Sequence, residues 1–398
     1  MKIDRIFGKD PKHLAGIDKE KEIQDILKTG VLSDFVFDNP FNSKTKKEIC
    51  DILVLFDNTM IIFQVKSTKK PEKHSQKIIK KAINQIKGAN RLIQRGELKE
   101  LNNTRQGKIK FNIGDVKNII NVIIASARDY EYWGSTLRFE SGNLYFHLFD
   151  DINLKEILNI LDTPLDFIEY LVKREEFLNN SIIINASELD LLGLYISSGH
   201  KFILPEDDNK PDVVNLFGFW SDENNKMLKN LETRGRLNRI SYLYDYLINQ
   251  AHKCTGENYI KIALEMAKIK RLERRELGRR IYGTGLLSIK NNNDSSGALN
   301  FRNSKTVFYI LFSNLPREDR KKKLIFMGEL TKYKMKGLKV IGVATEIPPP
   351  TPIPTPSSFD YYFNEEPWIY DEYLEEYKSA INIQKENIKY TEFGNTIE

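Results

Sequence analysis

The sequence predicts an α/β protein in two parts: residues 1–150 have the element order α-β-β-β-α-β, and residues 151–398 form a helix-rich α/β region. Three patterns carry this prediction. Two apolar runs joined by a tight turn predict a β-hairpin, an amphipathic run behind it predicts a long helix, and a strand-helix-strand pattern follows near the C-terminus. A chain of 398 residues also exceeds the size at which one hydrophobic core usually keeps growing, so two domains are expected.

The first part opens with a short helix and three strands. Residues 17–30 have the apolar spacing of an amphipathic helix, which Gly30 ends as a C-cap. The run DFVFDNPF predicts a strand that its Asn-Pro pair stops. The next run, ICDILVLFDNTMIIFQVKST, predicts two strands near residues 49–56 and 60–67, joined by the turn Asp57-Asn58-Thr59. These two strands form the predicted hairpin.

A long helix and a buried strand complete this part. The segment after Pro71 carries apolar residues at the spacing of a helix with one buried face, and lysines and arginines occupy the opposite face. Residues 97–115 are polar and predict a loop. The run NIINVIIASA near 118–127 is apolar and rich in β-branched residues, which is typical of a central strand buried on both faces.

The second part is mainly helical and then turns to α/β. Helical patterns cover residues from about 151 onward with a break at Thr163-Pro164, and two long ones follow near 224–253 and 257–282. The runs KTVFYILFS, PREDRKKKLIFMGELTKYKMK and KVIGVATE predict a parallel βαβ unit. The proline-rich stretch 347–358 predicts an exposed loop, and we expect the aromatic, acidic segment behind it to pack back onto the fold.

Composition excludes several classes of protein. No apolar core of a signal peptide is present, and no window approaches the roughly 20 apolar residues that span a bilayer, so we expect a cytoplasmic protein without a membrane partner. Cys50 and Cys254 are too far apart to predict a disulfide framework or a cysteine zinc site. The net charge of +6 is compatible with a polyanionic partner without establishing one.

Three polar residues interrupt the apolar hairpin. Asp51 opens its first strand, and Gln64 and Lys66 lie two apart on the second, so their side chains leave the same face of the sheet. Burying such groups is costly unless they are paired. A metal-bound site would pair them, whereas the structural alternative is a half-exposed strand with Lys66 in solvent.

This pattern resembles the PD-(D/E)xK nuclease superfamily over about residues 10–130. A carboxylate at a strand start, a hairpin, the triplet QVK and a following helix are closest to its Mrr-like branch, where glutamine often replaces the acidic residue of the triplet. That branch has an acidic residue on its opening helix, which Glu20 matches, with Glu22 as the weaker substitute. The chain departs from the pattern in having no proline before Asp51. The neutral Gln64 also lowers the negative charge available to Mg²⁺, for which Glu20 or Glu48 would compensate.

The resemblance implies a restriction-endonuclease-like fold and hydrolysis of DNA phosphodiesters with Mg²⁺, or Mn²⁺ as its substitute. Asp51, the Gln64 side-chain oxygen, the Val65 carbonyl and Glu20 are the implied metal ligands, and Lys66 would orient the attacking water or stabilise the developing charge. A restriction or anti-phage defence role is implied for the whole protein. The alternatives are an RNA-directed nuclease and a non-catalytic DNA-binding or assembly protein on a degenerate nuclease fold.

The helix after the motif offers contacts for a nucleic-acid backbone. Such contacts add affinity without reading sequence, although a solvated helix face explains the same charges. Gln85 on this helix is an auxiliary candidate for the site. The basic residues selected are Lys73, Lys77, Lys81 and Arg91.

A second basic cluster lies at Arg271, Arg274, Arg275 and Arg279. Glutamates interleave with these arginines, which favours a structural or partner-binding role over a grip on nucleic acid. Two cuts on antiparallel strands would favour a twofold-symmetric homodimer, although no coiled-coil seam is visible in the sequence.

Overall fold

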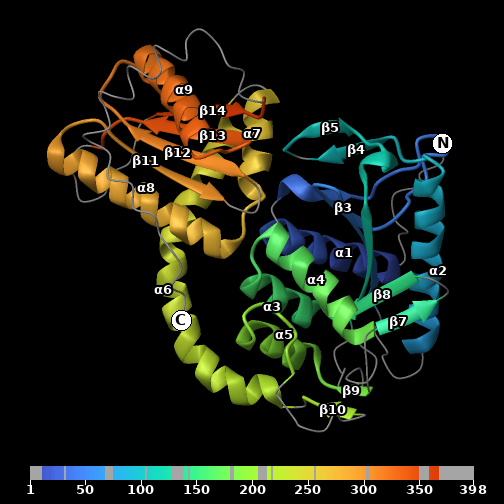
Figure 1. The fold of residues 1–398 in the computed structure, drawn as a ribbon. Helices are drawn as coiled ribbons and strands as arrows, with labels where there is room; N and C mark the ends of the chain where they lie inside the picture. The colour runs from blue at the N-terminus through green and yellow to red at the C-terminus, as the bar shows by residue number, and fades with distance from the viewer. Residues whose placement is uncertain are drawn as a thin grey trace. The chain divides into compact units, whose positions relative to one another are not determined.

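The computed structural model describes twelve stretches of the chain, and Figure 1 traces them. These are residues 11–30, 33–67, 75–103, 105–126, 138–141, 144–179, 183–204, 213–216, 218–254, 257–301, 305–348 and 358–366. Helices and strands alternate within them, which confirms a mixed α/β protein. The chain forms two compact units, residues 1–245 with 263–275 and residues 246–262 with 276–398, and each is described by itself. No helix in the described stretches combines the length and the apolar character needed to cross a membrane.

The first unit contains a large sheet with helices on both faces. Its helices are α1 (Pro11–Gly30), α2 (Ser75–Gln94), α3 (Asp151–Ile160), α4 (Pro164–Asn179) and α5 (Glu188–Ser197), with the short 3₁₀ helices η1 (Ser33–Phe35) and η3 (Ile113–Asp115). Three further helices lie partly in each unit: α6 (Phe219–Lys253), α7 (Glu257–Ala267) and α8 (Arg271–Asn291). Its strands are β1 (Val36–Asp38), β2 (Ile52–Phe56), β3 (Thr59–Ser67), β4 (Glu100–Asn103), β5 (Gly107–Lys110), β6 (Asn118–Ser126), β7 (Arg138–Ser141), β8 (Leu144–Phe149), β9 (Ile183–Asn185) and β10 (Val213–Asn215).

The large sheet has the strand order β1-β2-β3-β6-β8-β7. The hairpin of β2 and β3 is antiparallel, as predicted, and β3 pairs in parallel with β6, whose central position the apolar run predicted. The predicted order α-β-β-β-α-β is observed from α1 to β6 with one addition. Residues 97–115, predicted to be a loop, contain the antiparallel hairpin of β4 and β5. Asn103 holds this hairpin against η1 and β1 by donating to the backbone carbonyls of Ser33, Asp34 and Val36.

Two hydrophobic cores lie on the two faces of this sheet. Alternate residues of a strand point to opposite faces, so Ile61 and Phe63 of β3 join one core while Met60 and Ile62 join the other. The first core also takes side chains from α1, α3, α4 and α5. The second takes the apolar stripe of α2. Gln64 and Lys66 share the face of Met60 and Ile62, so they project to the side covered by α2.

The predicted boundary at residue 150 falls inside the first of these cores. Phe149 at the end of β8 and Ile157 of α3 belong to the same buried cluster as the strands of the hairpin, together with Phe167 and Leu171 of α4. The apolar sheet face therefore receives its cover from helices that follow residue 150 in the sequence.

The second unit is built on a four-stranded sheet. Its remaining elements are β11 (Ser295–Phe301), β12 (Thr306–Phe312), α9 (Arg317–Lys334), β13 (Lys339–Thr345) and β14 (Phe359–Asn364). β12 and β13 are parallel and α9 crosses between them, which confirms the predicted βαβ unit. β14 accounts for the first residues of the aromatic segment predicted to pack back, whereas residues 349–357 of the proline-rich stretch and residues 367–398 lie outside the described residues.

The single helix predicted near 257–282 is two helices, α7 and α8. The break has a physical cause in the capping of α8: Asp166 accepts a hydrogen bond from the Arg271 backbone N–H (2.9 Å), and Glu273 accepts one from the Lys270 N–H (3.2 Å). Carboxylates satisfy the free N–H groups of a new helix start at this point.

Candidate active site

Asp51 lies just before β2 and is held rigidly. Its backbone carbonyl accepts a hydrogen bond from Asn39 N–H (3.1 Å), which continues the pairing of β1 with β2. The residue is 7% exposed, and one carboxylate oxygen, Oδ2, accepts hydrogen bonds from the Val65 N–H (2.6 Å) and from the Gln64 side-chain amide. The carboxylate therefore has a defined orientation toward β3.

Gln64 and Lys66 meet Asp51 as the hairpin geometry predicted. The register of the hairpin pairs Ile52 with Phe63, so Asp51 stands opposite Gln64, which is 2% exposed. The Lys66 ammonium lies 3.8 Å from Asp51 Oδ2 and donates to the Val65 carbonyl (2.8 Å). Lys66 is thus an ion-pair partner within the site, which argues against the alternative that it projects into solvent.

Glu48 brings a second carboxyl group to Asp51. An isolated β-bridge to Phe41 holds its backbone, and its side chain forms a hydrogen bond with Asp51. Loss of surrounding water raises the pKa of Glu48 to about 7, and the negative charges of Asp51 and Glu20 add to the rise, although the residue as a whole is exposed. The pKa of Asp51 is raised by burial and is partly restored by Lys66 and by its hydrogen bonds. With its pKa near 7, Glu48 is partly protonated at neutral pH and can donate its proton to Asp51 in this hydrogen bond.

Glu20, rather than Glu22, is the acidic residue of α1 that acts on the site. The charge of Glu20 contributes to the raised pKa of Glu48 and opposes the lowering of the Lys66 pKa by burial. Glu22 is 54% exposed and accepts a hydrogen bond from Lys19 (2.8 Å), which also contacts Asp151 at the start of α3. The contact between Lys19 and Asp151 ties α1 to α3.

The oxygen donors suit a hard divalent cation. Mg²⁺ is usually bound through one or two carboxylates together with waters and substrate phosphates, which Asp51 and Glu48 can provide by exchanging the proton of Glu48 for the ion. In the described stretches, no group of three acidic, histidine or cysteine side chains is arranged to coordinate a metal ion. The Gln64 amide nitrogen is directed at Asp51, and the Val65 carbonyl accepts from Lys66, so their roles as metal ligands stay predictions.

Comparisons with protein-family models, curated proteins and solved structures find no match. The chemistry of the site and the arrangement of the elements around it are therefore the basis for assigning a function.

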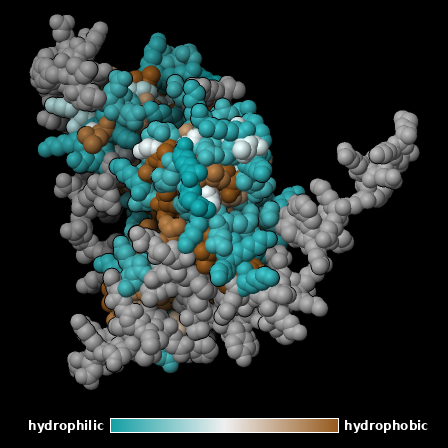
Figure 2. All heavy atoms as spheres, turned by 90° about the vertical axis from the view of Figure 1, so that its right-hand side faces the viewer, coloured by the Kyte–Doolittle hydropathy of each residue, from teal (hydrophilic) through white to brown (hydrophobic). Residues whose placement is uncertain are grey.

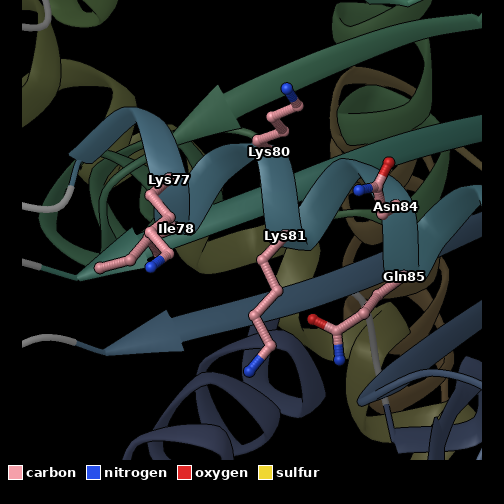
Figure 3. A pocket seen from close by; sticks show the side chains of 6 residues that line it. All are labelled: Lys77, Ile78, Lys80, Lys81, Asn84 and Gln85. Carbon is pink, nitrogen blue, oxygen red and sulfur yellow. The ribbon is translucent and has the colours of Figure 1, made fainter.

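The outer face of α2 carries the basic residues selected from the sequence. Lys77, Lys81 and Arg91 are exposed, while Lys73 lies outside the described residues. The described surface on the side that carries α2 is mainly hydrophilic (Figure 2). A hollow of 690 Å³ runs along this helix, and Figure 3 shows its lining, which consists of Lys77, Ile78, Lys80, Lys81, Asn84 and Gln85.

The second basic cluster is largely structural. Arg274 is 1% exposed and donates to Asp245 (2.7 Å) and to two backbone carbonyls at the end of α7. Arg271 is buried between Asp162 and Asp245. Arg279 is exposed but pairs with Glu276 (2.5 Å). These contacts agree with the structural role that the interleaved charges favoured.

Glu48 is the site residue that the sequence indicated least clearly. Its position in a lysine-rich turn is typical of a solvated loop, and the only signal is that it stands three residues before Asp51 in one extended segment. The β-bridge that turns it toward Asp51 depends on Phe41, seven residues earlier, and no local pattern predicts that pairing.

Proposed function

We propose that this chain is a Mg²⁺-dependent nuclease that hydrolyses DNA, with its site at the end of β3. The observation that supports this most directly is the meeting of Asp51, Gln64 and Lys66 on one sheet face, with a second carboxyl group from Glu48. The sequence resemblance to PD-(D/E)xK nucleases and the order of elements from α1 to β6 support a restriction-endonuclease-like unit. A restriction or anti-phage defence role, and a dimer that cuts both strands, are further parts of this proposal.

Each residue has a role that its surroundings suit. Asp51 and Glu48 are the carboxylates that hold Mg²⁺, which when bound polarises the phosphate and lowers the pKa of a water molecule. Gln64 orients Asp51 through its amide, and Glu20 adds negative charge from α1. Lys66 orients the attacking water and stabilises the added charge on phosphorus as one P–O bond forms and the bond to the leaving sugar oxygen breaks.

A non-catalytic binding protein is the second candidate, and one observation favours it. Asp51 Oδ2 is already engaged by Gln64, Val65 and Lys66, and the triplet carries an amide in place of a carboxylate. Such an arrangement also fits a nuclease fold that has kept its nucleic-acid surface and lost its metal. RNA is the alternative substrate for an active enzyme, because none of the named site residues distinguishes ribose from deoxyribose.

Cleavage assays separate these candidates. Plasmid DNA, single-stranded DNA and RNA are incubated with wild type, Asp51→Asn and Lys66→Ala in Mg²⁺, Mn²⁺ or EDTA, and Glu22→Gln serves as the control on the outer side of α1. We expect metal-dependent DNA cleavage by wild type and Glu22→Gln, and a loss of at least about a hundredfold in both site variants. Cleavage that persists in Lys66→Ala would refute the assignment. Salt-dependent DNA binding without cleavage under any condition would favour the non-catalytic alternative.

A further inference from the structure

We propose that Phe41 is a base-stacking residue of this site and that the substrate strand reaches it with an unpaired base beside the scissile phosphate. This inference rests on the proposed nuclease function and makes it more specific, because it names the substrate class: single-stranded DNA, or DNA whose strands are locally separated. Its basis is the backbone pairing of residues 39–51 and the side chains that this pairing exposes.

Backbone pairing places Phe41 directly opposite Glu48, in an isolated antiparallel bridge. The hydrogen bonds on either side of the bridge run from Ile49 N–H to the Pro40 carbonyl and from Asn42 N–H to the Lys47 carbonyl (2.8 Å each). Phe41 and Glu48 are therefore a non-hydrogen-bonded pair, the kind in which opposite residues come closest, with about 4.5 Å between their Cα atoms. Opposite side chains leave the same face of such a pair, so the Phe41 ring lies beside the carboxyl group that bonds to Asp51.

The Phe41 ring is exposed although its backbone is fixed. The residue is 54% exposed, and it is the one phenylalanine among the exposed large apolar residues of the described stretches. An aromatic ring that is already held in place binds a flat, apolar partner without a further cost of ordering the chain. The bases of a single strand are such partners, because every base has a face on which a ring can stack.

The turn that joins Phe41 to Glu48 is rigid and basic. Buried Asn42 accepts hydrogen bonds at Oδ1 from the N–H groups of Lys44 (2.9 Å) and Thr45 (3.0 Å), and its amide donates to Glu97. Three lysines of the turn are exposed, and within the described part of the chain their ammonium groups form no ion pair: Lys44, Lys46 and Lys47. A ring that stacks on bases beside cations that follow the backbone is the usual means of binding a single strand.

Variants at position 41 separate stacking from general apolar contact. Binding of a labelled single-stranded oligonucleotide and of its duplex is measured by fluorescence anisotropy in EDTA. We expect Phe41→Ala to weaken single-strand binding by roughly tenfold, Phe41→Leu to lose a similar factor because it has no ring, and Phe41→Trp to bind at least as tightly as wild type. Duplex binding stays within about twofold in all three variants, since paired bases are not available for stacking. Cleavage of the single strand in Mg²⁺ falls in parallel in Phe41→Ala.

Two controls accompany these variants. Val172→Ala removes an exposed apolar side chain from α4, which covers the opposite face of the sheet, and we expect its binding to stay within about twofold of wild type. An abasic strand of the same length keeps the phosphates and removes the bases. Wild type and Phe41→Ala should bind this strand equally, because the two changes remove the same contact. The pair Phe41→Leu and Phe41→Trp retains a large side chain and decides the comparison if alanine lowers the unfolding midpoint.

The outcomes distinguish this inference from the function on which it rests. If wild type cuts DNA but the leucine and tryptophan variants bind single strands alike, or if the loss in Phe41→Ala persists on the abasic strand, the stacking role is refuted and the nuclease assignment stands. If wild type neither binds nor cuts DNA, both are refuted. A ring-dependent loss that disappears on the abasic strand, together with cleavage by wild type, supports both.

Discussion

At the scale of single residues, the site depends on how each polar group is solvated and partnered. Asp51 and Gln64 are nearly completely buried, and their mutual hydrogen bond offsets the cost of removing them from water. Glu48 stays near the surface, yet its raised pKa lets it donate a proton to Asp51 near neutral pH. A carboxyl pair of this kind is stable as a singly protonated unit or around a cation, and both states can be tested.

The first test at this scale is the pH dependence of stability. Glu48 has a pKa of about 7 in the folded chain against its ordinary value of 4.5, so the folded state holds more protons between these values. The free energy of unfolding must then fall as the pH rises from 4.5 to about 7. We expect Glu48→Gln to have a shallower slope in this window and Glu22→Gln to keep the slope of wild type, as measured by urea unfolding in EDTA. Identical slopes in all three proteins would contradict the raised pKa of Glu48.

The second test is metal binding without catalysis. An ion that binds only the folded state raises the unfolding midpoint by an amount that grows with its concentration. We expect Mg²⁺ or Mn²⁺ to raise the midpoint of wild type, to have no effect on Asp51→Asn and to have a smaller effect on Glu48→Gln. Differential scanning fluorimetry measures these shifts. Equal shifts in wild type and Asp51→Asn would show that the ion binds elsewhere.

At the scale of elements, buried ion pairs decide where helices begin and end. The arginine cluster at the start of α8 is the clearest case, since Arg271 pairs with both Asp162 and Asp245 of α6, and Arg274 pairs with Asp245. Their charges are neutralised within the fold, and so the cluster contributes little to a nucleic-acid surface. In the β4–β5 hairpin a neutral side chain has the corresponding role, because Asn103 holds the hairpin in place through hydrogen bonds to three backbone carbonyls.

A comparison of two arginines of α8 tests this conclusion. Arg274→Met removes the buried donor of two backbone carbonyls and one of the two arginines that neutralise Asp245, so we expect it to lower the free energy of unfolding by about 3–5 kcal/mol. Arg279→Met removes an exposed pair and should cost less than about 1 kcal/mol. Urea unfolding of the full chain measures both values. Similar effects of the two substitutions would argue against the buried role of Arg274.

At the scale of the whole molecule, the first unit is assembled from distant parts of the chain. Residues 263–275 belong to it, although α7 and α8 continue into the second unit. The sheet face with Ile61 and Phe63 is covered by helices that follow residue 150. The segment for which the sequence predicts a nuclease-like unit therefore shares its core with helices that follow it.

A truncation tests this dependence. A fragment of residues 1–150 would expose the apolar face that α3, α4 and α5 cover, and burial of large apolar side chains is the main stabilising contribution to folding. We expect this fragment to lack a cooperative unfolding transition and to bind a hydrophobic dye, whereas the full chain unfolds cooperatively. Circular dichroism during urea unfolding and dye fluorescence measure the two properties. A cooperative transition in the fragment would show that residues 1–150 are a domain by themselves.

Local periodicity in the sequence was sufficient to predict most of the elements. Apolar residues form continuous runs in β2 and in the first part of β3, which are buried on both faces, and they repeat at helical spacing in α2, which is buried on one face. Successive side chains of a strand point to opposite faces, which places Gln64 and Lys66 on one face. The hairpin turn then brought Asp51 opposite them, so the three central residues of the candidate site could be chosen without coordinates.

Only the tertiary structure decided the choices that depend on contacts between distant segments. The closeness of Glu48 to Asp51 and the preference for Glu20 over Glu22 both depend on which side chains meet and how far they are removed from water. The same holds for the break between α7 and α8, where Asp166 of α4 caps a helix that begins 105 positions later. Periodicity reports which face of a segment is buried, whereas the identity of the partner on that face is determined only when the chain is folded.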